Sequence, residues 1–277
     1  MKAIHMKKVF FLLFIFTSIN FVGQEKLKGD KIVVTEDRNI SEFTKIEIRD
    51  DIDVILKQGE NQSVTVESDE NLQGAVLTNV SNNTLTIDLS NKIIRKKTLL
   101  VYVTVNQNID EIITKDKSKL ITSGSLNFNN ITINAEGDSK IIMDLKTTDF
   151  NLNNNESGSL TFNVNSDNAF LKANKTGKSK INITTNKLEV LSQGNSTTEL
   201  TGYCKEVLFT SENKSKLRAE KLECEEILIN ASDNSDSHVN AKNSISISAI
   251  NLAEIYIYNN PTIRIRKFAD KAVLRKK

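Results

Sequence analysis

The sequence predicts an all-β fold, a right-handed parallel β-helix or β-solenoid of about eight rungs of roughly 19 residues, preceded by a β-rich N-terminal segment. Three observations predict it. The chain repeats itself from Ile112 to Pro261, its apolar segments alternate with polar residues, and its 277 residues include one Pro, no Trp and few aromatic side chains. Helical periodicity over ten or more residues, roughly the length of a typical helix, is missing after the first residues.

Residues 1–23 have the pattern of a signal peptide. A lysine-rich start precedes the apolar run at 9–16, and residues 17–23 resemble a cleavage region. We expect cleavage between Gly23 and Gln24, and therefore an exported protein in the periplasm, on the outer surface or secreted. The alternative is an uncleaved N-terminal anchor, for which the apolar run is short. No later segment could cross a membrane as a helix.

Next come a polar lead-in at 24–37 and a series of short alternating segments. Alternation of apolar and polar residues is typical of half-buried strands. The turn cluster at 81–83, between 76–80 and 85–89, predicts a hairpin, and residues 91–97 form a charged link. The expected strands are Ile32–Val34, Phe43–Ile48, Ile52–Leu56, Val64–Glu67, Leu85–Leu89 and Leu99–Val105.

The repeat predicts two strands per rung, joined by a polar turn. A small residue recurs two positions before an aliphatic one, which indicates a tight corner followed by a stacked core residue. The clearest rungs are Ile131–Asp149, Phe150–Asn168, Ala169–Lys187 and Leu188–Glu206. The small residues are Ser118, Ser139, Gly158, Ser179, Thr198, Ser215, Ser237 and Ala253, and the aliphatic ones Leu120, Ile141, Leu160, Ile181, Leu200, Leu217, Val239 and Ile255.

Cys204 and Cys224 are spaced by about one rung. They should therefore stack on neighbouring coils about 4.8 Å apart, a separation that a disulfide permits. Export would bring the chain into an oxidising compartment. The alternative is a pair of buried thiols that pack as small apolar residues.

The turns and the C-terminal end have structural and functional interpretations. Asparagine is frequent in the turns, where it tolerates left-handed backbone and can form ladders; the alternative is a sugar-binding groove lined by Asn and Asp. Tyr256 and Tyr258 share one face of the final rung, and Pro261 suits the end of the solenoid. The basic tail at 262–277 is expected to cap the terminal edge, with a membrane or polysaccharide contact as the alternative.

No motif for catalysis, cofactor binding or metal binding is found. Lys and Arg number 37 against 35 Asp and Glu, so no strong field points to nucleic acid. The chain contains no nucleophile elbow, phosphate loop, zinc signature or calcium loop. After signal removal one histidine remains, His238, which we expect in a turn. Carboxylates such as Asp50, Asp51 and Asp53 are expected to be solvated.

A series of short sequence motifs in the N-terminal part resembles a known family. Arg38 to Ile46 leads to Asp51-Ile52-Asp53-Val54-Ile55-Leu56-Lys57-Gln58-Gly59, then to Ser63-Val64-Thr65-Val66-Glu67, Asp69-Glu70-Asn71-Leu72 and Thr84-Leu85-Thr86-Ile87. These phrases, in this order, are similar to the putative auto-transporter adhesin family, head GIN domain. The resemblance covers residues 38–89, and the β-repeats that follow, up to Pro261, are similar to those of the family. It implies an exported, largely β-helical protein of a Gram-negative bacterium, often from the Bacteroidetes, with a head GIN-like domain at 38–261 and no catalytic residues to carry over.

The leading functional hypothesis is a non-enzymatic, exported, adhesin-like protein. Its stacked faces would bind a cell-surface glycan or an envelope protein. The alternatives are a carbohydrate-active β-helix enzyme, lyase-like or glycosidase-like, and an accessory protein in envelope-stress regulation. A groove with clustered Asp and Glu beside Lys or Arg would favour the enzyme, whereas a face of Ser, Thr and Asn alone would exclude it.

Overall fold

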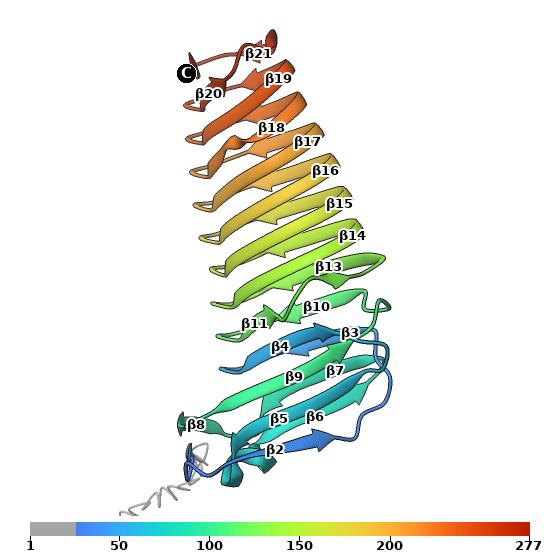
Figure 1. The fold of residues 1–277 in the computed structure, drawn as a ribbon. Coiled ribbons are helices and arrows are strands. Elements are labelled where there is room, and N and C mark those ends of the chain that lie inside the picture. The colour runs from blue at the N-terminus through green and yellow to red at the C-terminus, as the bar shows by residue number, and fades with distance from the viewer. Residues whose placement is uncertain (1–25) are drawn as a thin grey trace, which may run out of the picture.

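The computed structural model describes residues 26–277 as a β-solenoid of about nine turns, with 68% strand and 2% helix (Figure 1). The predicted fold class is confirmed. The signal peptide and its Gly23–Gln24 junction lie outside the described residues. The elements are β1 (Lys26–Lys28), β2 (Val33–Arg38), β3 (Lys45–Ile48), β4 (Asp53–Gln58), β5 (Ser63–Asp69), the 3₁₀ helix η1 (Glu70–Ala75), β6 (Val76–Ser81), β7 (Thr84–Leu89), β8 (Lys92–Arg95), β9 (Leu99–Val105), β10 (Glu111–Thr114), β11 (Lys119–Thr122), β12 (Leu126–Asn127), β13 (Asn130–Ala135), β14 (Lys140–Asn154), β15 (Ser159–Ala173), β16 (Lys178–Ser192), β17 (Thr197–Ser211), β18 (Lys216–Ala231), β19 (Asp236–Ala249), β20 (Glu254–Tyr258), β21 (Thr262–Phe268) and β22 (Val273–Lys276).

The N-terminal part closes one end of the solenoid with antiparallel strands. β2 pairs with β5 and β5 with β9, while β6 and β7 form the predicted hairpin. Asn82 and Asn83 at its tip both have positive φ, as a two-residue hairpin turn requires. The segment 91–97 is more than a link, because its residues form β8, which pairs with β1.

Chain order and spatial order differ at this end. β3 and β4 form a coil that pairs on one side with β7 and β9 and on the other with β10 and β11. The strands that lie beneath β3 and β4 therefore come later in the sequence (Figure 1). Above this point the coils follow in chain order.

From β14 to β19 each coil is one long strand, not two separate strands. Ile141 pairs with Leu160 and Phe150 with Ala169, which sets the coil length at 19 residues. Along β14 the buried positions alternate up to Thr147, two outward residues follow, and the alternation resumes at Phe150. This change of phase bends the strand from one face of the solenoid to the other without ending it.

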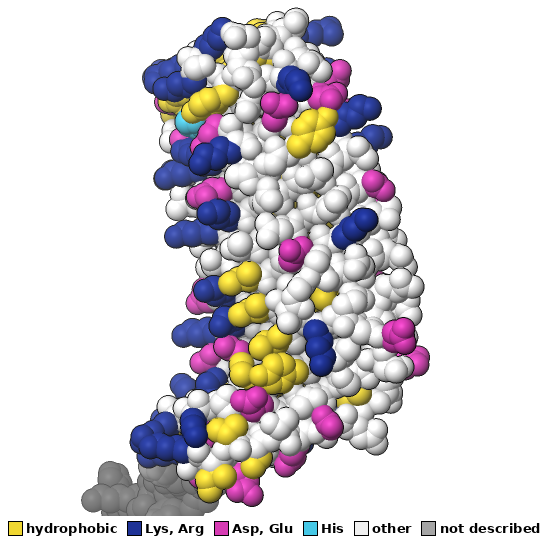
Figure 2. Space-filling model, viewed as in Figure 1, with side chains coloured by type: hydrophobic (Ala, Val, Ile, Leu, Met, Phe, Trp, Pro, Cys, Tyr) yellow, Lys and Arg dark blue, Asp and Glu magenta, His cyan; other side chains and the backbone are white. Residues whose placement is uncertain are grey.

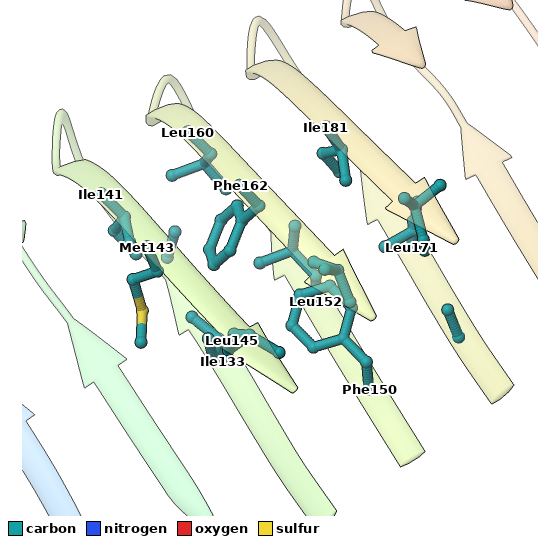
Figure 3. Close-up of a cluster of buried hydrophobic side chains, with 14 of the residues drawn as sticks. Ile133, Ile141, Met143, Leu145, Phe150, Leu152, Leu160, Phe162, Leu171 and Ile181 are labelled. Carbon is teal, nitrogen blue, oxygen red and sulfur yellow. The ribbon is translucent and has the colours of Figure 1, made fainter. Parts of the chain in front are cut away.

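The core lies between the two faces. Ile141, Met143 and Leu145 from one half of β14 point toward Ile133, Phe150 and Leu152 on the opposite face (Figure 3). The rings of Phe150 and Phe162 are 5.6 Å apart. Each coil buries its apolar side chains against those of its neighbours, so one coil alone would have no core.

The predicted column of small residues is confirmed at five positions and wrong at Ser179, Thr198 and Ser237. Ser118, Ser139 and Gly158 do share one inward column, but Ser179 pairs with Leu160. In the same way Thr198 pairs with Leu217. The inward column nevertheless stays small along the solenoid, and the residues that continue it are Gly177, Ser196, Ser215, Ser235 and Ala253. The predicted Ser179, Thr198 and Ser237 lie two positions further along, in the next buried column.

The solenoid does not stop at Pro261. This proline lies in the connection between β20 and β21, and residues 262–276 add another partial coil, in which β21 pairs with β19 and β22 with β20. Among residues 26–277, no helix is long and apolar enough to span a bilayer.

Candidate binding groove

An open groove of about 810 Å³ crosses the coils from β13 to β21. It follows the outside of the bend in the long strands, where two outward residues come together. Its lining consists of two outward rows and the buried residues between them. The residues that contribute charge or apolar surface are Asp149, Phe170, Lys187, Glu189, Glu206, Leu208, Glu226, Leu228 and Arg266.

The floor of this groove is partly apolar. Phe170, Leu208 and Leu228 are outward, half-buried side chains of one row, with Glu189 between the first two. The sequence carries a signal for them, because three apolar residues in succession break the alternation at 169–171, 207–209 and 227–229. In each triplet the middle residue must face outward.

The lip of the groove carries carboxylates. Glu189, Glu206 and Glu226 are exposed, and none of them has an ion pair or hydrogen bond within residues 26–277. Asp149 differs, since its Oδ1 accepts a hydrogen bond of 2.8 Å from Asn168. Lys187 lies beside Glu206 in the register.

The charged side chains of the groove include both carboxylates and cations. The groove combines carboxylates with Lys187 and Arg266, the combination that would favour an enzyme. Glu189, Glu206 and Glu226 are exposed, and Glu206 and Glu226 are register partners on neighbouring coils. In the part of the chain that the structure describes, no three His, Cys, Asp or Glu side chains could hold a metal ion together.

The two cysteines lie side by side where the sequence places them. Cys204 on β17 pairs with Cys224 on β18, their Cα atoms are 4.6 Å apart and their Sγ atoms are bonded. Both side chains are fully buried. The pair packs in the core near the bend and does not line the groove.

The turn residues have a structural role. Each turn of the solenoid except one holds a residue with positive φ, and many of these are Asn or Asp. The Asp233 carboxylate accepts the N–H of Asn213 at 3.4 Å, and that of Asp270 accepts the N–H of Asn251 at 3.3 Å. These bonds link neighbouring turns through Asp carboxylates and backbone N–H groups, not through a ladder of Asn side chains. The stacked turn residues with positive φ are Asp50, Asp116, Gly137, Lys175, Gly194, Asn213, Asp233, Asn251 and Asp270. Figure 2 shows Lys and Arg side chains interspersed with carboxylates along this edge.

The sequence predicted His238 in a turn, but the structure places it on strand β19. Its ring stacks on Tyr256 with centroids 4.4 Å apart, its Nδ1 is 3.0 Å from the Tyr258 hydroxyl, and its Nε2 is 3.3 Å from Asp236 Oδ1. Burial, followed by the charge of Arg218, lowers the pKa of His238. The two tyrosines therefore pack on a polar network and do not form an open stacking platform.

The Asp69-Glu70-Asn71-Leu72 phrase also has a structural role. The Asp69 carboxylate is inaccessible to solvent and accepts the backbone N–H groups of Lys31, Lys97 and Thr98 at 3.1 to 3.2 Å. Burial raises the pKa of this carboxyl, but the N–H donors outweigh it and hold the pKa below its ordinary value. Asn71 makes two more hydrogen bonds to the N-terminal segment. The phrase fastens that segment to the antiparallel end.

Comparison with known proteins agrees with this architecture. The family model described as "Putative auto-transporter adhesin, head GIN domain" matches residues 42–163 and 161–261. A putative adhesin from Parabacteroides merdae has a TM-score of 0.68 at 15% identity, covering 91% of this chain and 99% of that one. A putative adhesin from Parabacteroides distasonis has a TM-score of 0.66 at 14% identity, covering 91% and 100%. A putative lipid binding protein from the same species has a TM-score of 0.61 at 17% identity, also covering 91% and 100%. At these identities the likeness is one of fold. No curated protein matches the sequence.

Proposed function

Because the chain belongs to the putative auto-transporter adhesin family, head GIN domain, we propose that it is an exported, non-enzymatic, adhesin-like protein of the cell envelope. It would bind a glycan or a protein through the stacked faces of its solenoid. The observation that carries this proposal is the open groove with the half-buried side chains Phe170, Leu208 and Leu228 on its floor. Partly exposed apolar side chains beside polar groups are typical of binding surfaces.

The groove is preferred over the turns as the contact surface. A shallow hollow of about 620 Å³ follows the turns and contains Asn174, Asn195, Asn213 and Asp233. Several polar groups there already bond to the neighbouring turn, as the Asp233 carboxylate does with Asn213. The groove glutamates have no such partners among the described residues and are free to meet a ligand.

The test compares two matched double variants. Phe170→Ser with Leu208→Ser removes the apolar floor, while Ile121→Ser with Ile142→Ser removes two neighbouring outward apolar side chains on the other half of the coils. Binding is measured on a glycan array, on envelope fragments and on lipid vesicles. We expect the wild-type protein and the second variant to bind and the groove variant to lose binding. Equal binding by the groove variant, or no binding to any of these probes, would contradict the proposal.

A carbohydrate-active enzyme is the second candidate function, because the groove places Glu206 beside Lys187. The wild-type protein is incubated with acidic and neutral polysaccharides, and new reducing or unsaturated ends are measured. We expect none above the blank. Release of such ends that disappears in Glu206→Gln would overturn the non-enzymatic assignment.

A further inference from the structure

The charge of the groove identifies a partner more closely than its shape does. Its lining includes four carboxylates, from Asp149, Glu189, Glu206 and Glu226, against two cations, Lys187 and Arg266. Of the four, only Asp149 has a hydrogen-bond partner among residues 26–277. The groove is therefore acidic where it is exposed.

On β17 and β18 the acidic positions lie in one outward row and the apolar positions in the next, while on β16 Lys187 continues the first row and Glu189 the second. Glu206 and Glu226 are register partners on β17 and β18, and Leu208 and Leu228 are partners two positions further along the same strands. Neighbouring strands are about 4.8 Å apart, so like charges face each other across the two coils at a cost in stability. A ligand that brings cations to this row and apolar groups to the leucine row would relieve that repulsion and cover the exposed floor.

We propose that the groove binds an extended polypeptide segment in which cationic side chains lie next to apolar ones. This inference rests on the proposed binding function and narrows its ligand class. Acidic polysaccharides and anionic membranes would be repelled by Glu189, Glu206 and Glu226. A neutral glycan would have to desolvate these carboxylates and would return no charge to them. Lys and Arg side chains supply that charge, and their stems pack on apolar surface.

The chain itself contains a segment with this chemistry. In β21, Ile263, Ile265 and Phe268 are 43%, 48% and 44% exposed, and Arg264, Arg266 and Lys267 are interspersed with them. A synthetic peptide with the sequence of residues 262–268, TIRIRKF, is therefore a suitable probe. A second copy of the chain would be one natural source of such a segment.

The experiment measures binding of this labelled peptide to the full chain by fluorescence anisotropy. We expect binding that weakens with added salt. Glu206→Gln with Glu226→Gln should weaken it by about tenfold, since two charge pairs are lost without a change of shape. Phe170→Ser with Leu208→Ser should also weaken it, whereas Ile121→Ser with Ile142→Ser should not. A control peptide with glutamate in place of the three cations should not bind.

Three outcomes would overturn the inference: no binding of the cationic peptide, equal binding of the acidic peptide, or equal binding by the glutamine variant. If envelope binding depends on Phe170 and Leu208 but the peptide does not bind, the inference fails and the proposed function stands. If the peptide binds but the variant with Phe170→Ser and Leu208→Ser binds envelope fragments as well as the wild-type protein does, the proposed function fails. Self-association in sedimentation velocity that is lost in the glutamine variant would support the inference, with a second copy as the source.

Discussion

Replacing Gly202, the one glycine among residues 26–277 that lies in a strand, by alanine should strongly destabilise the solenoid. Gly202 lies in β17 with φ of +111°, beside an irregularity in the pairing with β18. A Cβ at this position would lie 2.1 Å from the carbonyl oxygen of Ile183, its register partner on β16. The obstacle is backbone, which cannot rotate away as the end of a flexible side chain can.

Two costs add at this position. Holding a side chain at such a φ costs about 1–3 kcal/mol, and forcing extra volume into a packed site costs about 1–3 kcal/mol. We therefore expect Gly202→Ala to lower the free energy of unfolding by about 2–6 kcal/mol, the sum of these two ranges. The strand must shift to accept the methyl group, and Cys204, two residues on, would shift with it.

Urea unfolding followed by circular dichroism provides the measurement. Gly74→Ala is the matched control, because Gly74 in η1 has no atom within 4 Å of the added Cβ and no positive φ. Its effect should be within about 0.5 kcal/mol, as for most surface changes. If Gly202→Ala unfolds at the same urea concentration as the wild-type protein, the reasoning from the Ile183 carbonyl is refuted.

Three further predictions concern the cysteines, Asp69 and His238. We propose that Cys204 and Cys224 are oxidised in the exported protein: mass spectrometry without reductant should show their peptides linked, and Cys204→Ser with Cys224→Ser should cost about 3 kcal/mol for a separation of 20 residues; free thiols would contradict this. Asp69→Asn should cost about 3 kcal/mol, since charge-assisted bonds to three backbone N–H groups are weakened. Because the folded pKa of Asp69 is depressed, its stabilising effect is present above about pH 4 and lost as the pH falls, so the variant should show a smaller loss of stability in acid. The folded pKa of His238 is also lowered, so the unfolded chain takes up its proton first and stability should fall as the pH drops below about 6.5. His238→Gln should flatten this part of the profile of unfolding free energy against pH, and an unchanged slope would count against it.

The fold follows from the sequence where alternation is regular. The triplet Ser81-Asn82-Asn83 and the alternating run at 99–105 predicted their elements closely, because turn chemistry and strand period are local properties. The merging of two strands into β14 was not predictable in this way, since two successive polar residues at 148–149 suit a bend and a break equally. The alignment of Ser179 under Gly158 failed for a related reason: Gly177 and Ser179 are both small, and the hydrogen bonds between coils place Gly177 in that column.

The groove was missed because binding residues on a solenoid have no motif. Phe170, Leu208 and Leu228 come from three coils and become neighbours only through the register. The triplets of apolar residues are visible in the sequence, but a single triplet does not show that its middle residue lines a groove. The contact between the two cysteines was easier to predict, because a spacing of about one coil places two residues side by side on neighbouring coils.

The position of the β3–β4 coil between two sets of strands that both come later in the sequence determines how the protein can fold. Contacts such as Lys45 with Glu111 close a loop of 66 residues, whereas contacts in the upper coils close loops of 19. The longer loop costs about 1 kcal/mol more in chain entropy for its first contact. Formation of the N-terminal end is therefore the slow step of folding, because it requires the chain up to Thr122 to be present at once. After it, each new coil adds onto a finished edge, so folding should proceed toward the C-terminus one coil at a time.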